Sequence, residues 1–274
     1  MNIYNNKVAV ITGAGSGIGR ALAIEVARRG AKLALSDIND DGLKETAKII
    51  GSESTFCQTV DVADLEQISR FAKDTMAHFG VIHQLYNNAG IASHFASIMD
   101  TPYSEFEKIL NINLWGVIYG TREFLPHIIA SGDGHIINIS SLNGILAYPK
   151  LAPYVTSKFA VRGFTETLRT EMLIRSLPVK VVVVHPGGVK TAIASSAAKA
   201  ANKDGGEHIV KMYEEKLFVM TAEECAKIIL DGVNRGKSRI LTGQTASVDR
   251  LVRLFPQRYP GYIVSMMRRG KKKK

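Results

Sequence analysis

Cysteine and long apolar runs are scarce in this sequence, and each shortage excludes a class of protein. The 274 residues contain only two cysteines, Cys57 and Cys225, too few for a disulfide-stabilised secreted domain. One falls in an expected strand and the other in an expected helix, so we expect two buried free thiols in a reducing compartment. No apolar run is long enough to span a bilayer and no signal-peptide pattern is present, which favours a cytoplasmic protein.

Acidic residues are absent from residue 250 onward, where nine basic residues occur. Residues 1–249 carry a net charge of only +1, so +9 of the formal charge of +10 belongs to the segment 250–274. Apolar and aromatic residues alternate with these charges, a composition that suits an anionic membrane surface. A packed extension with a solvated lysine end is the alternative, and no fold that binds nucleic acid is indicated. Pro256 and Pro260 exclude a single long helix here.

The length and the alternation of elements predict one α/β domain. No internal repeat or low-complexity linker divides the chain. Repeated strand–helix units predict a single Rossmann-type doubly wound domain, with a seven-stranded parallel sheet flanked by helices, over residues 1–249. The expected strands are residues 7–11, 32–36, 55–60, 83–87, 134–140, 179–185 and 238–242.

Two expected helices begin with capping residues. Asp64 is the expected N-cap of helix 64–79, and the apolar residues from Leu65 to Phe79 are expected to form its buried face. Thr221 and Glu224 form a capping-box pattern at the start of helix 221–235.

A glycine-rich turn links the first expected strand to the first expected helix. Thr12 to Gly19 contains glycine at every second position from Gly13, and the helix that follows ends before Gly30. Glycines let the backbone approach a pyrophosphate, and a helix N-terminus offers free N–H groups and a positive dipole end. The turn therefore predicts a dinucleotide site, with an ordinary glycine-rich turn as the alternative.

Asp37 ends the second expected strand. A carboxylate at this position can hydrogen-bond the adenosine ribose and would repel a 2′-phosphate. The sequence therefore favours NAD over NADP. The alternative is a solvated aspartate that opens the turn 37–41.

Tyr154 and Lys158 are four residues apart, and Tyr154 follows Ser141 by thirteen residues. The spacing of four predicts that the tyrosine and lysine share one face of a helix. A phenol titrates near ~10, and a neighbouring ammonium is expected to lower that pKa towards neutrality. Such a pair makes an acid/base group, although isolated pairs also occur by chance.

These features together resemble the short-chain dehydrogenase/reductase family in its compact single-domain form. The resemblance covers about residues 5–245 and includes every catalytic position. The motifs that carry it are, in chain order, Thr12-Gly-Ala-Gly-Ser-Gly-Ile-Gly19, Asp61-Val62, Asn87-Asn-Ala-Gly90, Asn113-Leu-Trp-Gly116, the set Ser141, Tyr154 and Lys158, and Pro186-Gly-Gly-Val-Lys-Thr191.

The resemblance implies a role for each member of the catalytic set. Tyr154 would exchange the proton of the substrate hydroxyl, and Lys158 would lower the pKa of Tyr154 and bind the nicotinamide ribose. Ser141 would donate a hydrogen bond to the substrate oxygen, and Asn113 would hold a water that links Lys158 to solvent. The expected cofactor contacts are Gly13, Ser16, Gly17, Ile18, Gly19, Asp37, Asp61, Val62, Asn88, Ala89, Gly90, Tyr154, Lys158, Val189 and Thr191.

The sequence thus predicts an NAD-dependent oxidoreductase that acts on a small, hydrophobic secondary alcohol or ketone, because the segment 142–149 is mostly apolar. Residues 192–220 are expected to form either a lid or a surface helix. His94 and His185 lack ligand-like partners, so no metal is expected. The family resemblance implies a homodimer or homotetramer.

Three alternative functions remain at this stage. The first is a dinucleotide-sensing protein on the same fold, and the second is an epimerase or dehydratase, which usually needs a longer chain. The third is a peripheral-membrane member of the family that acts on lipid-like substrates.

Overall fold

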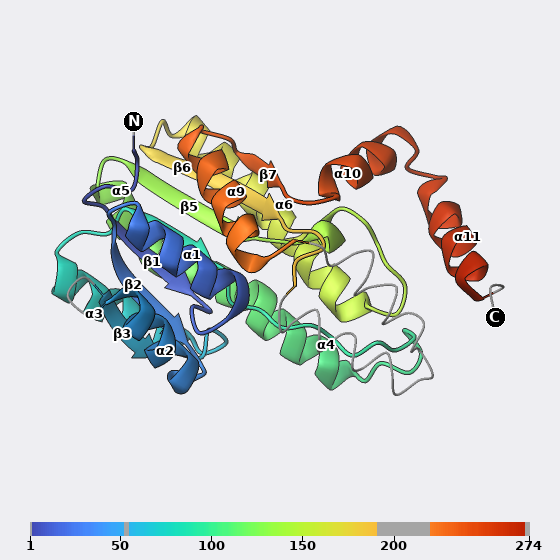
Figure 1. The fold of residues 1–274 in the computed structure, drawn as a ribbon, viewed down its shortest axis with the longest axis horizontal. Coiled ribbons are helices and arrows are strands. Elements are labelled where there is room, and N and C mark those ends of the chain that lie inside the picture. Colours follow the sequence, from blue (N-terminus) through green and yellow to red (C-terminus); the bar gives the residue numbers. More distant parts are fainter. Residues whose placement is uncertain (1, 52–54, 191–219, 272–274) are drawn as a thin grey trace.

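The computed structural model describes residues 2–51, 55–190 and 220–271, with side chains as far as residue 265. Thr191 and the expected lid at 192–219 lie outside the described residues. Figure 1 shows a single sheet with helices packed against it and the C-terminal helices beyond it.

The seven expected strands form one parallel sheet, which confirms the predicted fold. The strand order is β3-β2-β1-β4-β5-β6-β7, and every neighbouring pair is parallel. Because the chain moves outward from β1 and then returns to place β4 on its other side, the order reverses between β1 and β4. Ligands bind at the carboxyl ends of the strands near such a reversal. The strands are β1 (Val8–Thr12), β2 (Lys32–Asp37), β3 (Thr55–Thr59), β4 (Gln84–Asn87), β5 (Gly134–Ile139), β6 (Val179–His185) and β7 (Arg239–Leu241).

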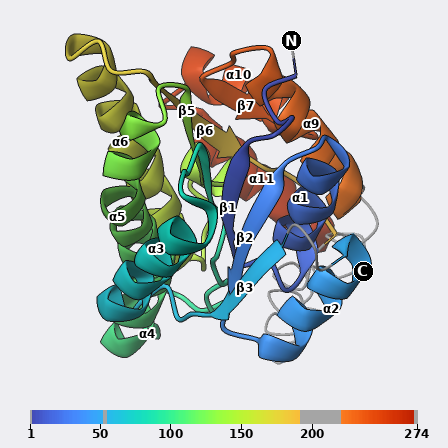
Figure 2. The ribbon, with the colours of Figure 1, turned by 90° about the vertical axis from the view of Figure 1, so that its left-hand side faces the viewer.

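Helices cover both faces of the sheet (Figure 2). One face carries α1 (Gly17–Arg28), α2 (Asp40–Ile50) and α9 (Ala222–Asn234). The other carries α3 (Leu65–Phe79), α4 (Tyr103–Leu110), α5 (Gly116–Ala130) and α6 (Ala152–Ile174). Each face has its own apolar cluster because strands buried on both sides present aliphatic residues in both directions.

Both predicted caps are present. The Asp64 carboxylate accepts hydrogen bonds from the backbone N–H groups of Glu66 and Gln67, at 2.9 and 3.2 Å. Thr221 and Glu224 form the reciprocal capping box that begins α9. Local sequence therefore fixes where these helices begin.

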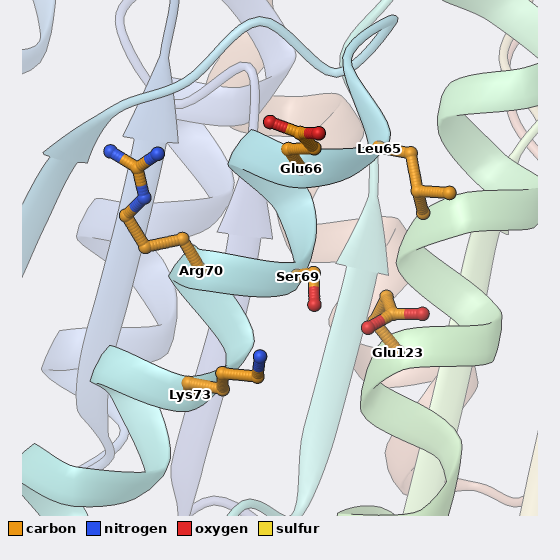
Figure 3. A pocket seen from close by; sticks show the side chains of 6 residues that line it. All are labelled: Leu65, Glu66, Ser69, Arg70, Lys73 and Glu123. Atoms are coloured by element: carbon orange, nitrogen blue, oxygen red, sulfur yellow. The ribbon is translucent and has the colours of Figure 1, made fainter.

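Leu65 departs from the expected buried face of α3, since it is 46% exposed. Leu65 is the first residue of the helix. Because side chains of a helix tilt towards its N-terminus, that of Leu65 extends past the part of the helix that packs on the sheet. It lines an open hollow between α3 and α5 (Figure 3), together with Glu66, Ser69, Arg70, Lys73 and Glu123. None of the predicted site residues lines this hollow.

The expectation of two buried thiols is wrong for one cysteine. Cys225 is buried in α9, where its Sγ lies 3.7 Å from the Thr242 hydroxyl and burial raises its pKa to about 11. Cys57 is exposed. It lies in β3, one of the two edge strands of the described sheet.

The basic C-terminal segment forms two helices, as the prolines predict. α10 (Thr245–Leu254) and α11 (Tyr259–Lys271) follow β7 and extend beyond the rest of the domain (Figure 1). Residue 249 lies within α10, so one helix spans both sides of the domain boundary predicted from charge. Across the described part of the chain, no helix is both long and apolar enough to cross a membrane.

Candidate active site

The glycine turn forms a close approach between two strand ends. Gly13 has a φ of +67°, and a Cβ at this position would lie 2.7 Å from the Cα of Ala89. A Cβ at Gly19 would overlap the carbonyl oxygen of Gly13. Both positions therefore require glycine.

The N-terminus of α1 has free donors. Ser16, its N-cap, makes no side-chain capping bond, and no acidic residue occupies the first turn, which begins at Gly17 and Ile18. Within the described residues, no side-chain cap or acidic residue therefore neutralises the positive end of the helix dipole. The backbone N–H groups of this turn can bind an anion. This donor set fits the pyrophosphate of a dinucleotide.

Thr12 joins the glycine turn to the segment after β4. Its hydroxyl oxygen accepts hydrogen bonds from the backbone N–H groups of Asn88 and Ala89, both at 3.1 Å. The Asn88 amide donates in return to the carbonyl oxygens of Thr12 and Gly13, at 3.0 and 3.1 Å. The sequence analysis did not assign Thr12 a role, although it opens the glycine motif.

The Asp37 carboxylate lies against the glycine turn. One oxygen accepts from the Gly15 N–H at 2.8 Å, and the other accepts from the Asn39 N–H at 2.9 Å. The same side chain therefore opens the turn after β2 and contacts the glycine-rich turn.

The other expected cofactor contacts lie at the carboxyl ends of strands. Asp61 follows β3 and accepts from the Ala63 N–H at 2.9 Å, and the adjacent Val62 is 7% exposed. Val189 follows β6 and pairs with Met220 in an isolated bridge. The placement of Thr191 lies outside the described residues.

Ser141, Tyr154 and Lys158 meet at the end of β5. Ser141 follows that strand, and its side chain lies close enough to the Tyr154 hydroxyl to lower the pKa of that phenol. Tyr154 and Lys158 lie one turn apart on α6, with the Lys158 Nζ 5.7 Å from the centre of the tyrosine ring. A Cβ at Gly90 would come within 3.4 Å of that Nζ, so the segment after β4 closes over the lysine.

Burial dominates the pKa of both groups on α6. It raises the pKa of Tyr154, and the hydrogen bond from Ser141 opposes this. It lowers the pKa of Lys158 to about 8. The expectation that Lys158 lowers the pKa of Tyr154 is therefore not met in the protein alone. The Lys158 ammonium donates to the Ile139 carbonyl oxygen at 3.1 Å.

Asn113 lies in a π-helical turn (Asn111–Trp115) between α4 and α5 and is fully buried. Its side chain accepts from the Ile91 N–H at 2.8 Å and donates to the Ile91 carbonyl at 3.0 Å. It also donates to the Ser157 hydroxyl at 3.1 Å, which in turn donates to the Tyr154 carbonyl at 2.7 Å. Asn113 thus ties the loop after β4 to the catalytic helix. Ser157 was missed by the sequence analysis, although it stands directly before Lys158.

The two histidines near the site have protein partners. His94 Nδ1 lies 3.0 Å from the Glu105 carboxylate, and His185 Nδ1 lies 2.9 Å from the Ser141 carbonyl oxygen. Among the described residues, no group of three or more His, Cys, Asp or Glu side chains is arranged to hold a metal ion.

Known proteins are similar to this chain in sequence and in fold. The family model for short chain dehydrogenases matches residues 7–202. A putative oxidoreductase, SadH, from Mycobacterium tuberculosis is 46% identical over 97% of this chain and 96% of its own. An 11-beta-hydroxysteroid dehydrogenase-like protein 6 from Arabidopsis thaliana is 38% identical over 91% of this chain and 73% of its own.

A solved structure agrees with the sequence relatives. The short chain dehydrogenase/reductase from Burkholderia phymatum, in complex with NAD, superposes with a TM-score of 0.84 at 26% identity. The match covers 93% of this chain and 95% of that chain. With the family model, the relatives and the fold in agreement, this chain belongs to the short chain dehydrogenase family of oxidoreductases.

Proposed function

We propose that the protein is an NAD-dependent oxidoreductase that interconverts a hydrophobic secondary alcohol and its ketone. The observation that carries the proposal is the hydrogen bond between Ser141 and Tyr154, with Lys158 one helical turn away. This group lies where Gly90 brings the segment after β4 close to Lys158. A proton donor and acceptor therefore adjoins the dinucleotide turn, which is what hydride transfer requires.

In the oxidative direction, Tyr154 as phenolate takes the proton of the substrate hydroxyl. A bound nicotinamide would supply the hydride acceptor for oxidation of the alcohol to the ketone. Ser141 donates its one hydroxyl proton in a hydrogen bond to the substrate oxygen, and so stabilises the charge that develops there. Lys158 supplies positive charge and a donor for the nicotinamide ribose. Asn113 is proposed to support the water that carries the proton to solvent.

Burial alone opposes the ionisation of Tyr154. A shift of the phenol from ~10 to ~7 needs about 4 kcal/mol of differential stabilisation. We propose that Ser141, Lys158 and the positive charge of the oxidised nicotinamide together provide it. This predicts that Tyr154 ionises at lower pH with NAD⁺ bound than without it.

Asp37 supports NAD rather than NADP as the cofactor. Its carboxylate touches the glycine turn at Gly15, at the end of β2 where the adenosine ribose would lie. A 2′-phosphate there would meet a like charge. The complex of the Burkholderia relative with NAD is consistent with this choice.

A hydrophobic substrate is supported by the segment between Ser141 and Tyr154, in which Gly144 and Ile145 are buried and the other residues from 142 to 149 are mostly apolar. The steroid dehydrogenase-like relative from Arabidopsis is named for a lipophilic alcohol substrate. Assembly as a homodimer or homotetramer is carried over from the family as part of the proposal.

The decisive experiment compares NAD⁺ with NADP⁺ turnover on a panel of medium-chain, aromatic and steroid-like secondary alcohols. We expect a strong preference for NAD⁺ and activity that rises with substrate hydrophobicity. Tyr154→Phe should abolish turnover but retain NAD⁺ binding, measured by calorimetry. Binding of NAD⁺ by the native protein, with no turnover of any alcohol or matching ketone, would favour the dinucleotide-sensing alternative.

Peripheral attachment of the protein to an anionic membrane is a second proposal, which the exposed face of α10 and the residues after it support. Leu254 and Phe255 are 66% and 42% exposed, and Arg250, Arg253 and Arg258 are exposed beside them. Among the residues from 250 onward there is no acidic side chain to oppose a negative surface. Apolar insertion and basic attraction together favour binding to anionic lipid.

Co-sedimentation with vesicles tests this attachment. We expect the native chain to bind vesicles that contain phosphatidylserine and not those of phosphatidylcholine alone, with binding weakened by salt. Leu254→Ser with Phe255→Ser should reduce binding. Leu173→Ser with Ile174→Ser is the matched control, since these residues are 65% and 78% exposed at the end of α6. Equal vesicle binding by the native protein and both double variants would show that the surface at Leu254 and Phe255 does not bind the membrane.

A further inference from the structure

His185, which has no assigned role in the reaction, makes a direct contact with the catalytic serine segment. It is the last residue of β6, is 0% exposed, and its Nδ1 lies 2.9 Å from the Ser141 carbonyl oxygen. Because a carbonyl oxygen can only accept, Nδ1 carries the proton and donates. Burial lowers the pKa of His185 to about 4, so the ring is neutral near pH 7.

The main chain on both sides of Ser141 is attached to the end of β6. The Ser140 N–H donates to the Val184 carbonyl at 2.8 Å, and the Leu142 N–H donates to the Pro186 carbonyl at 2.7 Å. The first bond runs from the serine segment to β6, and the second runs to the residue that follows the strand. Together they fix the main chain on both sides of Ser141, but neither of them involves the Ser141 carbonyl group.

The Ser141 carbonyl is held by two donors. One is the Gly144 N–H at 2.9 Å, within the short 3-10 turn that follows, and the other is the His185 ring. Pro186, directly after His185, has no backbone N–H to offer. The imidazole therefore provides a donor from β6 where its main chain cannot, and it links the turn to the sheet.

The orientation of this peptide group decides where the Ser141 hydroxyl lies. The Ser141 side chain accepts from the Asn143 N–H at 3.1 Å and bonds to the Tyr154 hydroxyl. A rotation of the peptide would move the hydroxyl relative to Tyr154. We propose that His185 is a positioning residue that fixes the Ser141 peptide and so keeps the serine hydroxyl aligned with Tyr154 and the substrate oxygen. The inference rests on the proposed function of the site.

The surroundings of the ring favour this structural use of a neutral imidazole. Its Nε2 has no hydrogen-bond partner among the residues that the structure describes. Arg162 and Glu166 of α6 and Asp249 of α10 are the charged groups that act on it. The positive and negative charges oppose one another, and the ring contributes one donor to the site.

Substitution of His185 tests the inference. His185→Phe keeps a buried ring but removes the donor, and His185→Asn keeps a donor close to the position of Nδ1. We expect His185→Phe to lower kcat about 10- to 100-fold with little change in the KM for NAD⁺, because misplaced catalytic groups slow the chemical step. His185→Asn should recover most of the lost kcat. An equal loss of kcat in His185→Asn and in His185→Phe would overturn the inference.

A double-mutant cycle separates positioning from general damage to the fold. Because His185 is proposed to act through Ser141, His185→Phe should cost little further activity in a Ser141→Ala background. An undiminished loss in that background would contradict the proposal. If thermal unfolding reveals that His185→Phe does not fold, His185→Met replaces it, since methionine also lacks the donor and adapts its shape.

Titration of Tyr154 gives a measure that does not need turnover. The hydrogen bond from Ser141 lowers the pKa of Tyr154, so its misplacement should raise that pKa. The pKa is read from phenolate absorbance, with Tyr154→Phe protein as the blank. A raised pKa in His185→Phe without turnover in any variant would refute the proposed function and keep the positioning role. Normal turnover with an unchanged pKa would refute the positioning role alone.

His135 provides the matched control. It lies on the neighbouring strand β5, is 1% exposed, and both ring nitrogens lack partners among the described residues. Burial lowers its pKa to about 4, as for His185. We expect His135→Phe to leave kcat unchanged, because the charged groups that act on this ring, Lys180, Asp133 and Lys7, lie outside the proposed site.

Discussion

The ammonium group of Lys158 donates a hydrogen bond to the carbonyl oxygen of Ile139, at 3.1 Å. Ile139 ends β5, and Ser141 follows it by two residues. The lysine therefore anchors α6 to the strand that carries the serine, one turn from Tyr154. Burial is the largest influence on the pKa of Tyr154 in the protein alone, and it raises that pKa.

Loss of the serine hydroxyl should affect the chemical step more than substrate binding. We expect Ser141→Ala to lower kcat about 100- to 1000-fold, because a donor to developing negative charge is removed. Ser141→Thr, which retains a hydroxyl, should lose less. Steady-state kinetics with the best alcohol from the panel provides the measurement. Equal losses in the two variants would show that the hydroxyl is not what matters.

Replacement of Asp37 should change cofactor preference. Asp37→Ser removes the carboxylate that meets the glycine turn, and we expect NADP⁺ to gain about 10- to 100-fold in relative kcat/KM as the like charge is lost. Asp41→Ser is the control, because Asp41 is exposed in the first turn of α2. If the ratio of kcat/KM for NAD⁺ to kcat/KM for NADP⁺ is unchanged in Asp37→Ser, the adenosine ribose does not bind beside Asp37.

A methyl group at Gly19 should disrupt the dinucleotide turn. The added Cβ would overlap the Gly13 carbonyl, so we expect Gly19→Ala to lose NAD⁺ binding and several kilocalories per mole of stability. Gly163→Ala is the matched control. No atom lies within 4 Å of its added Cβ in the described structure, and α6 should gain up to about 1 kcal/mol. Calorimetry and urea unfolding check both variants.

Stability should fall as the pH falls from about 6.5 to 4. His135 and His185 are buried and neutral, and burial lowers the pKa of each from 6.5 to about 4. The unfolded chain binds protons in this window and the folded chain does not, so acid favours unfolding. Each histidine should cost on the order of 3 kcal/mol by pH 4.

Urea unfolding at pH 7 and at pH 4.5 measures this effect. His135→Phe should remove roughly half of the contribution that the two buried histidines make to the difference. An undiminished difference in that variant would attribute the acid sensitivity to other groups.

Local features of this protein were predictable because they depend on residues close together in sequence. The glycine turn, the Asp64 cap and the Thr221 capping box each involve neighbours within a few positions. The spacing of Tyr154 and Lys158 likewise predicted one helical face. The parallel sheet was predicted from the alternation of apolar segments and helices, because the connections in such strand–helix–strand units are almost always right-handed.

Contacts between distant segments were decided by the tertiary structure. Thr12 bonds to residues 76 and 77 positions away, and Asn113 joins Ile91 to Ser157 across 22 and 44 positions. Burial by several elements at once set the pKa of Tyr154 and Lys158, and the edge position of β3 exposed Cys57. The sequence by itself thus determined which chemical groups are present and which local turns hold them. Only the packing of strands and helices decided their partners and their solvation, because desolvation and long-range hydrogen bonds depend on what the fold brings alongside.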